Sequence, residues 1–190
     1  MASARTDEAR RECADRTAEL AAALRSMIEG LTLVSRLEAG EMTPAPVDVP
    51  LVEAVVSAIQ AVGGYGSLIQ ARNLDGVAHV DPALFAPALE GLLLYAVKFA
   101  ADGPVKVSTS ASNRAAVIEI DFDGLHGRNA LKSLAFVELP PSGPGAHPMV
   151  GLGPALIVRM AETLNWRLDL AAGSDKRARV ILTLDVAPSS

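Results

Sequence analysis

Two glycines at the start of a predicted helix are the first residues whose type and spacing suggest chemistry. Gly151 and Gly153 flank Leu152, and Pro154 follows at a position where its fixed φ suits the first helical turn. Backbone N–H groups at a helix N-terminus attract anions, so these residues are candidates for phosphate binding. A tight turn from a loop into the helix is the alternative explanation for the same glycines.

Three charged residues elsewhere are further candidates for a binding site. Lys98 is close to the end of an apolar predicted helix, where it would meet a phosphate or simply extend its ammonium group to water. Asp121 and Asp123 belong to a predicted strand, with Phe122 between them. Side chains alternate along a strand, so both aspartates should point away from the face that Phe122 occupies. Only a one-residue slip or bulge would bring one of them to that face.

The cysteine and histidine content argues against a metal site. Cys13 is the only cysteine, which excludes an internal disulfide and a cysteine-based zinc site. The three histidines, His79, His126 and His147, do not have the spacing of metal ligands. His126 falls in a predicted loop, where a lone histidine is either catalytic or part of a polar surface. We therefore expect no metal and assign no catalytic residue.

The composition predicts one domain of ordinary size with a substantial core. The chain has 190 residues, of which 50% are hydrophobic and only 4% aromatic, so Ala, Val and Leu must provide most of the packing. A net charge of −5 argues against nucleic-acid binding. The N-terminal residues are charged, and no apolar run is long enough for a membrane span, so we expect a cytoplasmic protein.

Residues 4–38 are predicted to form one long helix with an apolar seam. The seam follows a heptad pattern, and its central members are candidate contacts for a partner or a second copy: Leu20, Leu24, Met27, Leu31 and Val34. Ile28, Leu33 and Leu37 widen the seam, which suits a helical bundle or packing on the rest of the chain. Gly40 should cap the helix, and three prolines after it predict an extended link.

The remaining pattern predicts an α+β layered domain, with an apolar central helix that begins after Asp81 as its N-cap. Residues 123–150 are rich in glycine and proline, which predicts a lid or a disordered insertion. The expected elements are helices over 51–62, 82–101 and 153–164, and strands over 67–72, 77–80, 104–110, 115–122, 166–171 and 178–186.

Three stretches, in the correct order, resemble bacterial sensor histidine kinases. They are Leu33-Val-Ser-Arg-Leu-Glu-Ala-Gly40, the stretch from Asp81 to Phe99, and Gly151-Leu-Gly-Pro-Ala-Leu-Ile-Val-Arg159. The resemblance implies an α+β chain in which a long N-terminal helix precedes a Bergerat-type, histidine kinase ATPase-like α/β two-layer sandwich. It divides the chain into a dimerisation-type stalk helix with linker, residues 1–44, and a degenerate ATP-binding domain, residues 45–190.

At several positions the sequence departs from the pattern that this resemblance implies. The asparagine that would hold Mg²⁺ falls on Tyr95, and a phenol is a poor Mg²⁺ ligand. Gly91 replaces an earlier asparagine, Phe122 replaces the aspartate for adenine, and His126 replaces a glycine. Residues 1–40 also contain no histidine that could accept a phosphoryl group. The residues that remain for nucleotide binding are Lys98, Asp121, Asp123, Gly124, Gly151 and Gly153.

The resemblance leaves three functional hypotheses. In the first, the chain is a pseudokinase of two-component signal transduction that binds a response regulator or a histidine kinase, forms a homodimer through its N-terminal helix, and needs no cofactor. In the alternative, it is a divergent kinase domain that binds ATP and Mg²⁺ weakly, through Asp121 or Asp123, Lys98 and the glycines, and phosphorylates a histidine in trans. A third hypothesis is that the degenerate pocket binds a different ligand: Tyr95 and Phe122 would either accept a small hydrophobic molecule or simply pack together as core.

Overall fold

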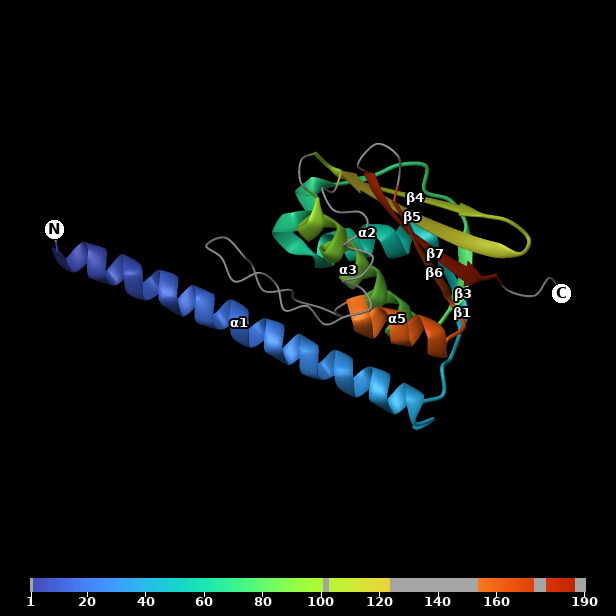
Figure 1. Ribbon diagram of the computed structural model, residues 1–190, viewed down its shortest axis with the longest axis horizontal. Helices are drawn as coiled ribbons and strands as arrows, with labels where there is room; N and C mark the ends of the chain where they lie inside the picture. Colours follow the sequence, from blue (N-terminus) through green and yellow to red (C-terminus); the bar gives the residue numbers. More distant parts are fainter. Residues whose placement is uncertain (1, 101–102, 124–153, 173–176, 187–190) are drawn as a thin grey trace.

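The computed structural model describes residues 2–100, 103–123, 154–172 and 177–186 of the chain. A long helix comes first, and the remaining elements form a layered domain beside its C-terminal end (Figure 1). The elements are α1 (Ala2–Glu38), β1 (Val47–Pro50), α2 (Leu51–Ala61), the 3-10 helix η1 (Gly63–Leu68), β2 (Ile69–Ala71), β3 (Val77–Val80), α3 (Pro82–Phe99), β4 (Val105–Ala111), β5 (Ala115–Asp123), α5 (Pro154–Thr163), β6 (Arg167–Ala172) and β7 (Arg177–Asp185).

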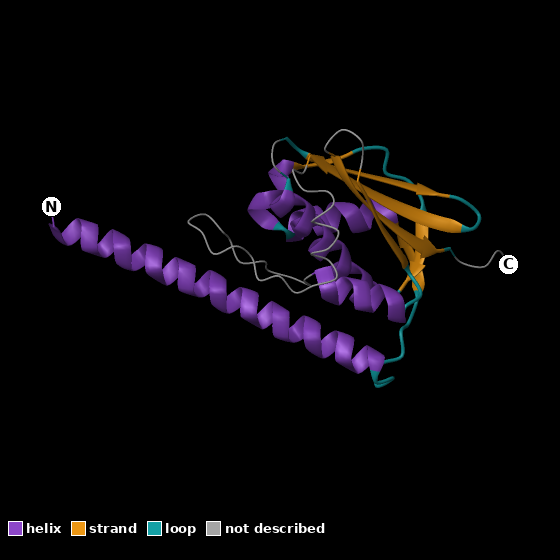
Figure 2. Cartoon of the chain, viewed as in Figure 1, coloured by secondary structure: helices purple, strands orange, loops and turns teal. Residues whose placement is uncertain are grey.

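The main sheet has five strands in the order β2-β4-β5-β7-β6. β2 runs parallel to β4, and the other neighbours are antiparallel, so the sheet is mixed, as the resemblance implies. The helices α2, α3 and α5 cover one side of this sheet (Figure 2). Along β5 the side chains alternate between this covered face and the open face, and the buried ones are Ala116, Ile118, Ile120 and Phe122. The architecture is the predicted two-layer sandwich.

The central helix is α3, as its apolar pattern predicts. Asp81 caps its N-terminus by accepting a hydrogen bond from Ala83 N, and Pro82 occupies the first helical position. Half of its residues are buried, including Leu84, Phe85, Leu89, Leu92, Leu93 and Tyr95. By length and composition alone α3 is also apolar enough to cross a membrane, a test that the buried core helix of a domain passes as well.

Two segments differ from the predicted elements. Val47–Pro50 is a strand, β1, that pairs antiparallel with β3 in a second, two-stranded sheet, where the prolines predicted only an extended link. An extended link and a strand have the same extended backbone. The strand forms because Val47–Pro50 pairs with β3, a segment further along the chain. The strand expected over 67–72 is shorter because η1 takes residues up to Leu68, and its first residue, Gly63, has a φ of +61°.

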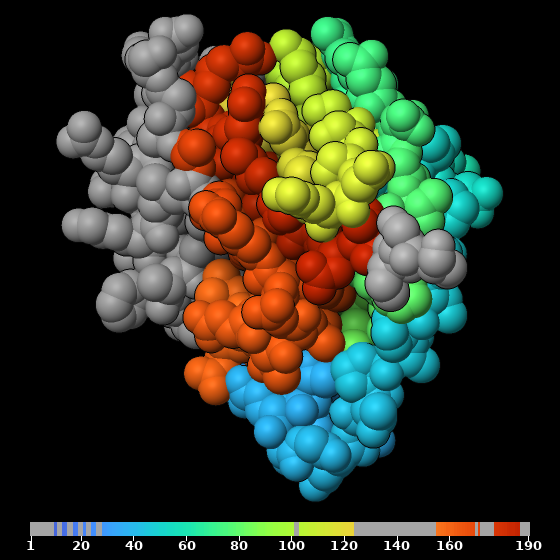
Figure 3. Space-filling view, turned by 90° about the vertical axis from the view of Figure 1, so that its right-hand side faces the viewer, coloured from blue at the N-terminus to red at the C-terminus, as the bar shows by residue number. Residues whose placement is uncertain are grey.

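The C-terminal end of α1 packs on the domain. Val34 and Leu37 are buried in the common core, and α1 contacts α5. Arg159 Nε on α5 donates a hydrogen bond of 2.7 Å to Glu38 Oε1. Gly40 ends the helix at a φ of +69°, as predicted for its cap. In Figure 3 the end of α1, in blue, lies directly beside the orange segment that contains α5.

Candidate functional site

The candidate site lies between α3 and β5, where three aromatic rings meet. Tyr95 and Phe122 are both buried, at 1% and 2% exposed, and their ring centroids are 6.2 Å apart at an interplanar angle of 86°. Phe99, one turn after Tyr95 on α3, lies 4.6 Å from the Tyr95 ring. Edge-to-face contacts of this kind are favourable for aromatic pairs. Tyr95 and Phe122 therefore pack together as core.

Burial also sets the chemistry of Tyr95. Removal from water disfavours the phenolate and raises the pKa of Tyr95 to about 12, so the phenol is neutral at physiological pH. Mg²⁺ prefers charged or strongly polar oxygen ligands in an open, hydrated geometry. A neutral phenol inside an aromatic cluster does not meet that requirement. Gly91, one turn earlier on α3, is buried as well and has no side chain to offer.

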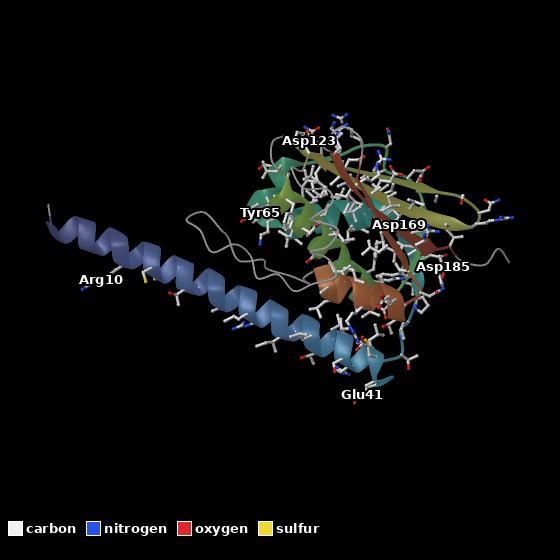
Figure 4. All side chains as sticks on the ribbon, in the orientation of Figure 1. Arg10, Glu41, Tyr65, Asp123, Asp169 and Asp185 are labelled. Atoms are coloured by element: carbon white, nitrogen blue, oxygen red, sulfur yellow. The ribbon has the colours of Figure 1, made fainter. Side chains whose placement is uncertain are left out.

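Asp121 and Asp123 lie on the open face of the sheet, away from Tyr95. Arg179 Nε donates a 2.6 Å hydrogen bond to Asp121 Oδ1, and Arg177 Nε donates one of 3.1 Å to Asp123 Oδ1. The β5–β7 register is regular through Phe122, without a bulge or slip. The strand alternation therefore separates both aspartates from the side chains on the core face, as their spacing predicts. Figure 4 shows Asp123 at the end of the sheet.

Two half-buried charged residues lie on α3. Burial lowers the pKa of Lys98 and raises the pKa of Glu90. Within the described residues, Lys98 makes no ion pair. Lys98 directly precedes Phe99 on α3, so it belongs to the same part of the helix as the aromatic cluster.

The glycine-rich part of the predicted site falls outside the part of the chain that the structure describes. Gly124, His126, Gly151 and Gly153 lie outside the described residues, as does the predicted lid, so their roles stay predictions. Among the residues that are described, no group of three or more histidine, cysteine, aspartate or glutamate side chains could hold a metal ion.

Comparisons with known proteins identify the fold. No protein-family model matches the chain, and no curated protein is a significant match. Solved structures do match. The Acinetobacter baumannii histidine kinase AdeS is 13% identical, with a TM-score of 0.61 over 84% of this chain and 76% of that one. Full-length ShkA in complex with AMPPNP is 14% identical, with a TM-score of 0.66 over 94% of this chain and 40% of that one. The histidine kinase domain of the E. coli osmosensor EnvZ is 19% identical, with a TM-score of 0.56 over 78% and 93%.

The chain has the histidine kinase fold. This confirms the fold expected from the three sequence motifs. At these identities the likeness concerns the fold alone, and function has to be argued from the site. In the histidine kinase fold of this chain, the two positions that the resemblance assigns to Mg²⁺ and adenine hold aromatic side chains in mutual contact.

The predicted apolar seam of α1 is divided between buried and exposed residues. Val34 is 3% exposed and packs on the domain, whereas Leu24 and Leu31 are 60% and 54% exposed. Ile28 is 63% exposed beside them. We call these three residues, Leu24, Ile28 and Leu31, the exposed edge of α1. The side chains of Leu20 and Met27 lie outside the described part of the structure.

Sequence reasoning missed two polar contacts that join distant segments. Arg159 and Glu38 connect α5 to α1, and His79 and Asp48 connect β3 to β1. Neither pair follows a local period, because the partners are far apart in the sequence. The sequence contained only an indirect indication of these contacts: each of the four residues is a polar side chain in or next to an apolar element.

Proposed function

We propose that this chain is a two-component signalling protein that acts by binding a response regulator or a histidine kinase, as a pseudokinase. The observation that carries the proposal is the buried contact between Tyr95 and Phe122. These side chains occupy the positions where the resemblance would have a Mg²⁺ ligand and an adenine-binding carboxylate. An apolar ring cannot accept a hydrogen bond from the adenine amino group, and the neutral phenol is a poor ligand for Mg²⁺.

Rebuilding a nucleotide pocket here would be costly. Removing a buried aromatic side chain from a core typically costs about 3–5 kcal/mol. Moving both rings aside to admit a nucleotide would forfeit much of that stabilisation for each. A micromolar affinity corresponds to about 8 kcal/mol. The rearrangement would therefore offset most of the free energy of a typical nucleotide complex.

The proposed mode of assembly is a homodimer through α1. The apolar arc of this helix is broad: one side packs on α5 through Val34 and Leu37, and the adjacent side is the exposed edge. A second copy of α1 is the partner that best fits the exposed edge. The exposed edge continues the heptad pattern of the sequence, and it lies next to the side of α1 that packs on α5. The dimer would present two domains to a partner protein.

Calorimetric titration of the folded chain with ATP, with and without Mg²⁺, tests the pseudokinase proposal. We expect no binding heat up to millimolar ATP. Circular dichroism of the same sample controls for folding. Micromolar binding strengthened by Mg²⁺ would contradict the proposal and favour the alternative, a divergent kinase domain that uses Lys98 and phosphorylates a histidine in trans.

A further inference from the structure

A histidine and an aspartate lie side by side on the small sheet that joins the stalk to the domain. The β1–β3 register places Asp48 directly opposite His79. The distance from His79 Nδ1 to Asp48 Oδ1 is 2.9 Å, and the two side chains are 33% and 61% exposed. The pair is therefore accessible from solvent while its geometry is set by the strand pairing.

The aspartate determines which ring nitrogen of His79 is reactive. A carboxylate can only accept a hydrogen bond, so Nδ1 carries the hydrogen and donates it to Asp48. Nε2 is then the nitrogen with the free lone pair. Within the described residues, no hydrogen bond involves Nε2 of His79. An oriented imidazole with one nitrogen held by a carboxylate is the arrangement of an activated nucleophile.

We propose that His79 is a phosphorylation site, accepting a phosphoryl group on Nε2 from a reactive donor of the acyl phosphate or phosphoramidate class. Nε2 attacks the phosphorus, and the bond from phosphorus to the leaving group breaks. The leaving group takes the electron pair and departs as a carboxylate, or as ammonia after protonation by water. The phosphorylated ring keeps its hydrogen on Nδ1 and carries a positive charge, which the Asp48 carboxylate stabilises.

The position of His79 gives the modification a structural context. β1 follows the link from α1, and Ala45 N in that link donates a hydrogen bond of 2.9 Å to Asp81 Oδ2. A phosphoryl group on Nε2 would thus stand at the junction of stalk and domain. It would leave the contact between Nδ1 and Asp48 intact, because that contact uses the other nitrogen.

The test is chemical labelling of the full chain with potassium phosphoramidate and, in a separate arm, with acetyl phosphate. Peptide mass spectrometry under alkaline conditions locates the phosphoryl group. We expect an acid-labile label on His79 that forms faster than any label on His126 or His147 in the same sample. A label on His79 from either donor supports the proposal and identifies the donor class, whereas no label on His79 from either donor would overturn it.

Variants separate the roles of the two residues. His79→Gln should remove the label, whereas His126→Gln and His147→Gln should leave it. Asp48→Asn keeps the shape but removes the charge, and should slow labelling of His79 relative to the other two histidines, because the ring loses its charged partner. Equal labelling of all three histidines in the unmodified chain, or an unchanged rate in Asp48→Asn, would overturn the proposal. Neither result depends on the ATP titration, so the two proposals can fail separately.

Discussion

Tyr95 and Phe122 pack against each other in the core. The change in stability caused by replacing one ring should therefore depend on whether the other ring is present. We predict that Tyr95→Leu and Phe122→Leu each lower the free energy of unfolding by about 1–3 kcal/mol. In the double variant, the two effects should differ from additivity by about 0.5–1.5 kcal/mol, because the edge-to-face contact is lost only once. Urea unfolding measures all four proteins.

A matched control for this cycle is available on the same helix. Phe85 makes an edge-to-face contact with Trp166, with ring centroids 6.1 Å apart, and is almost three turns of α3 away from Tyr95. Phe85→Leu combined with Tyr95→Leu should therefore be additive. If the Tyr95 and Phe122 variants were also additive, the two rings would not be coupled, and the main support for a filled pocket would be lost.

Glu90 provides a pH-dependent prediction at the same scale. Burial raises the pKa of this carboxyl in the folded state. A raised pKa means that the stability associated with the protonated form is present below the unfolded value of 4.5 and is lost as the pH rises through the folded value. We expect Glu90→Gln to stabilise the chain at pH 7, by at most about 1 kcal/mol, and to have little effect near pH 3. Thermal unfolding at both pH values measures the difference, and an equal effect at both would contradict the assignment.

At the scale of elements, one capping residue links α3 to the segment that follows the stalk. Asp81 Oδ1 accepts from Ala83 N at the start of α3, and Oδ2 accepts from Ala45 N. We predict that Asp81→Ala destabilises the chain by about 0.5–2 kcal/mol, since an N-cap is lost. Asp81→Asn should retain most of the stability because asparagine is also a good N-cap. Equal losses in the two variants, measured by urea unfolding, would show that the cap is not the cause.

The elements also show where sequence patterns are sufficient. The N-cap at Asp81, the cap at Gly40 and the alternation of β5 were all predicted, because each depends on residues within a few positions of one another. β1 was predicted only as a link and β2 as a longer strand. Strand formation there depends on a partner segment, and local patterns contain no information about which distant segment provides the hydrogen bonds.

At the scale of the whole molecule, α1 separates two surfaces with different roles. Val34 and Leu37 hold the helix on its own domain, whereas the exposed edge is available to another molecule. We predict that the double variant Leu24→Glu and Leu31→Glu is monomeric, while the unmodified chain is dimeric in analytical ultracentrifugation. The domain should unfold at the same urea concentration in both when compared as monomers, since neither leucine contributes to the core.

A charge change on an exposed polar residue controls for this prediction. Glu29 is exposed on α1, and Glu29→Lys should leave the dimer intact. If the unmodified chain sedimented as a monomer at all concentrations, the proposed homodimer would be contradicted. The exposed edge would then have to contact a different protein.

Sequence patterns were enough to predict the fold and the buried faces of most of its elements. Apolar residues repeat with the period of a helix or a strand, and the three motifs occur in the order of the histidine kinase fold, so both signals can be detected along the chain. The sequence also identified Tyr95 and Phe122 as departures from the pattern. Three contacts became known only from the folded structure: Tyr95 against Phe122, α1 against α5, and Asp48 beside His79. Such contacts depend on the path of the chain between distant segments, and no local period specifies that path.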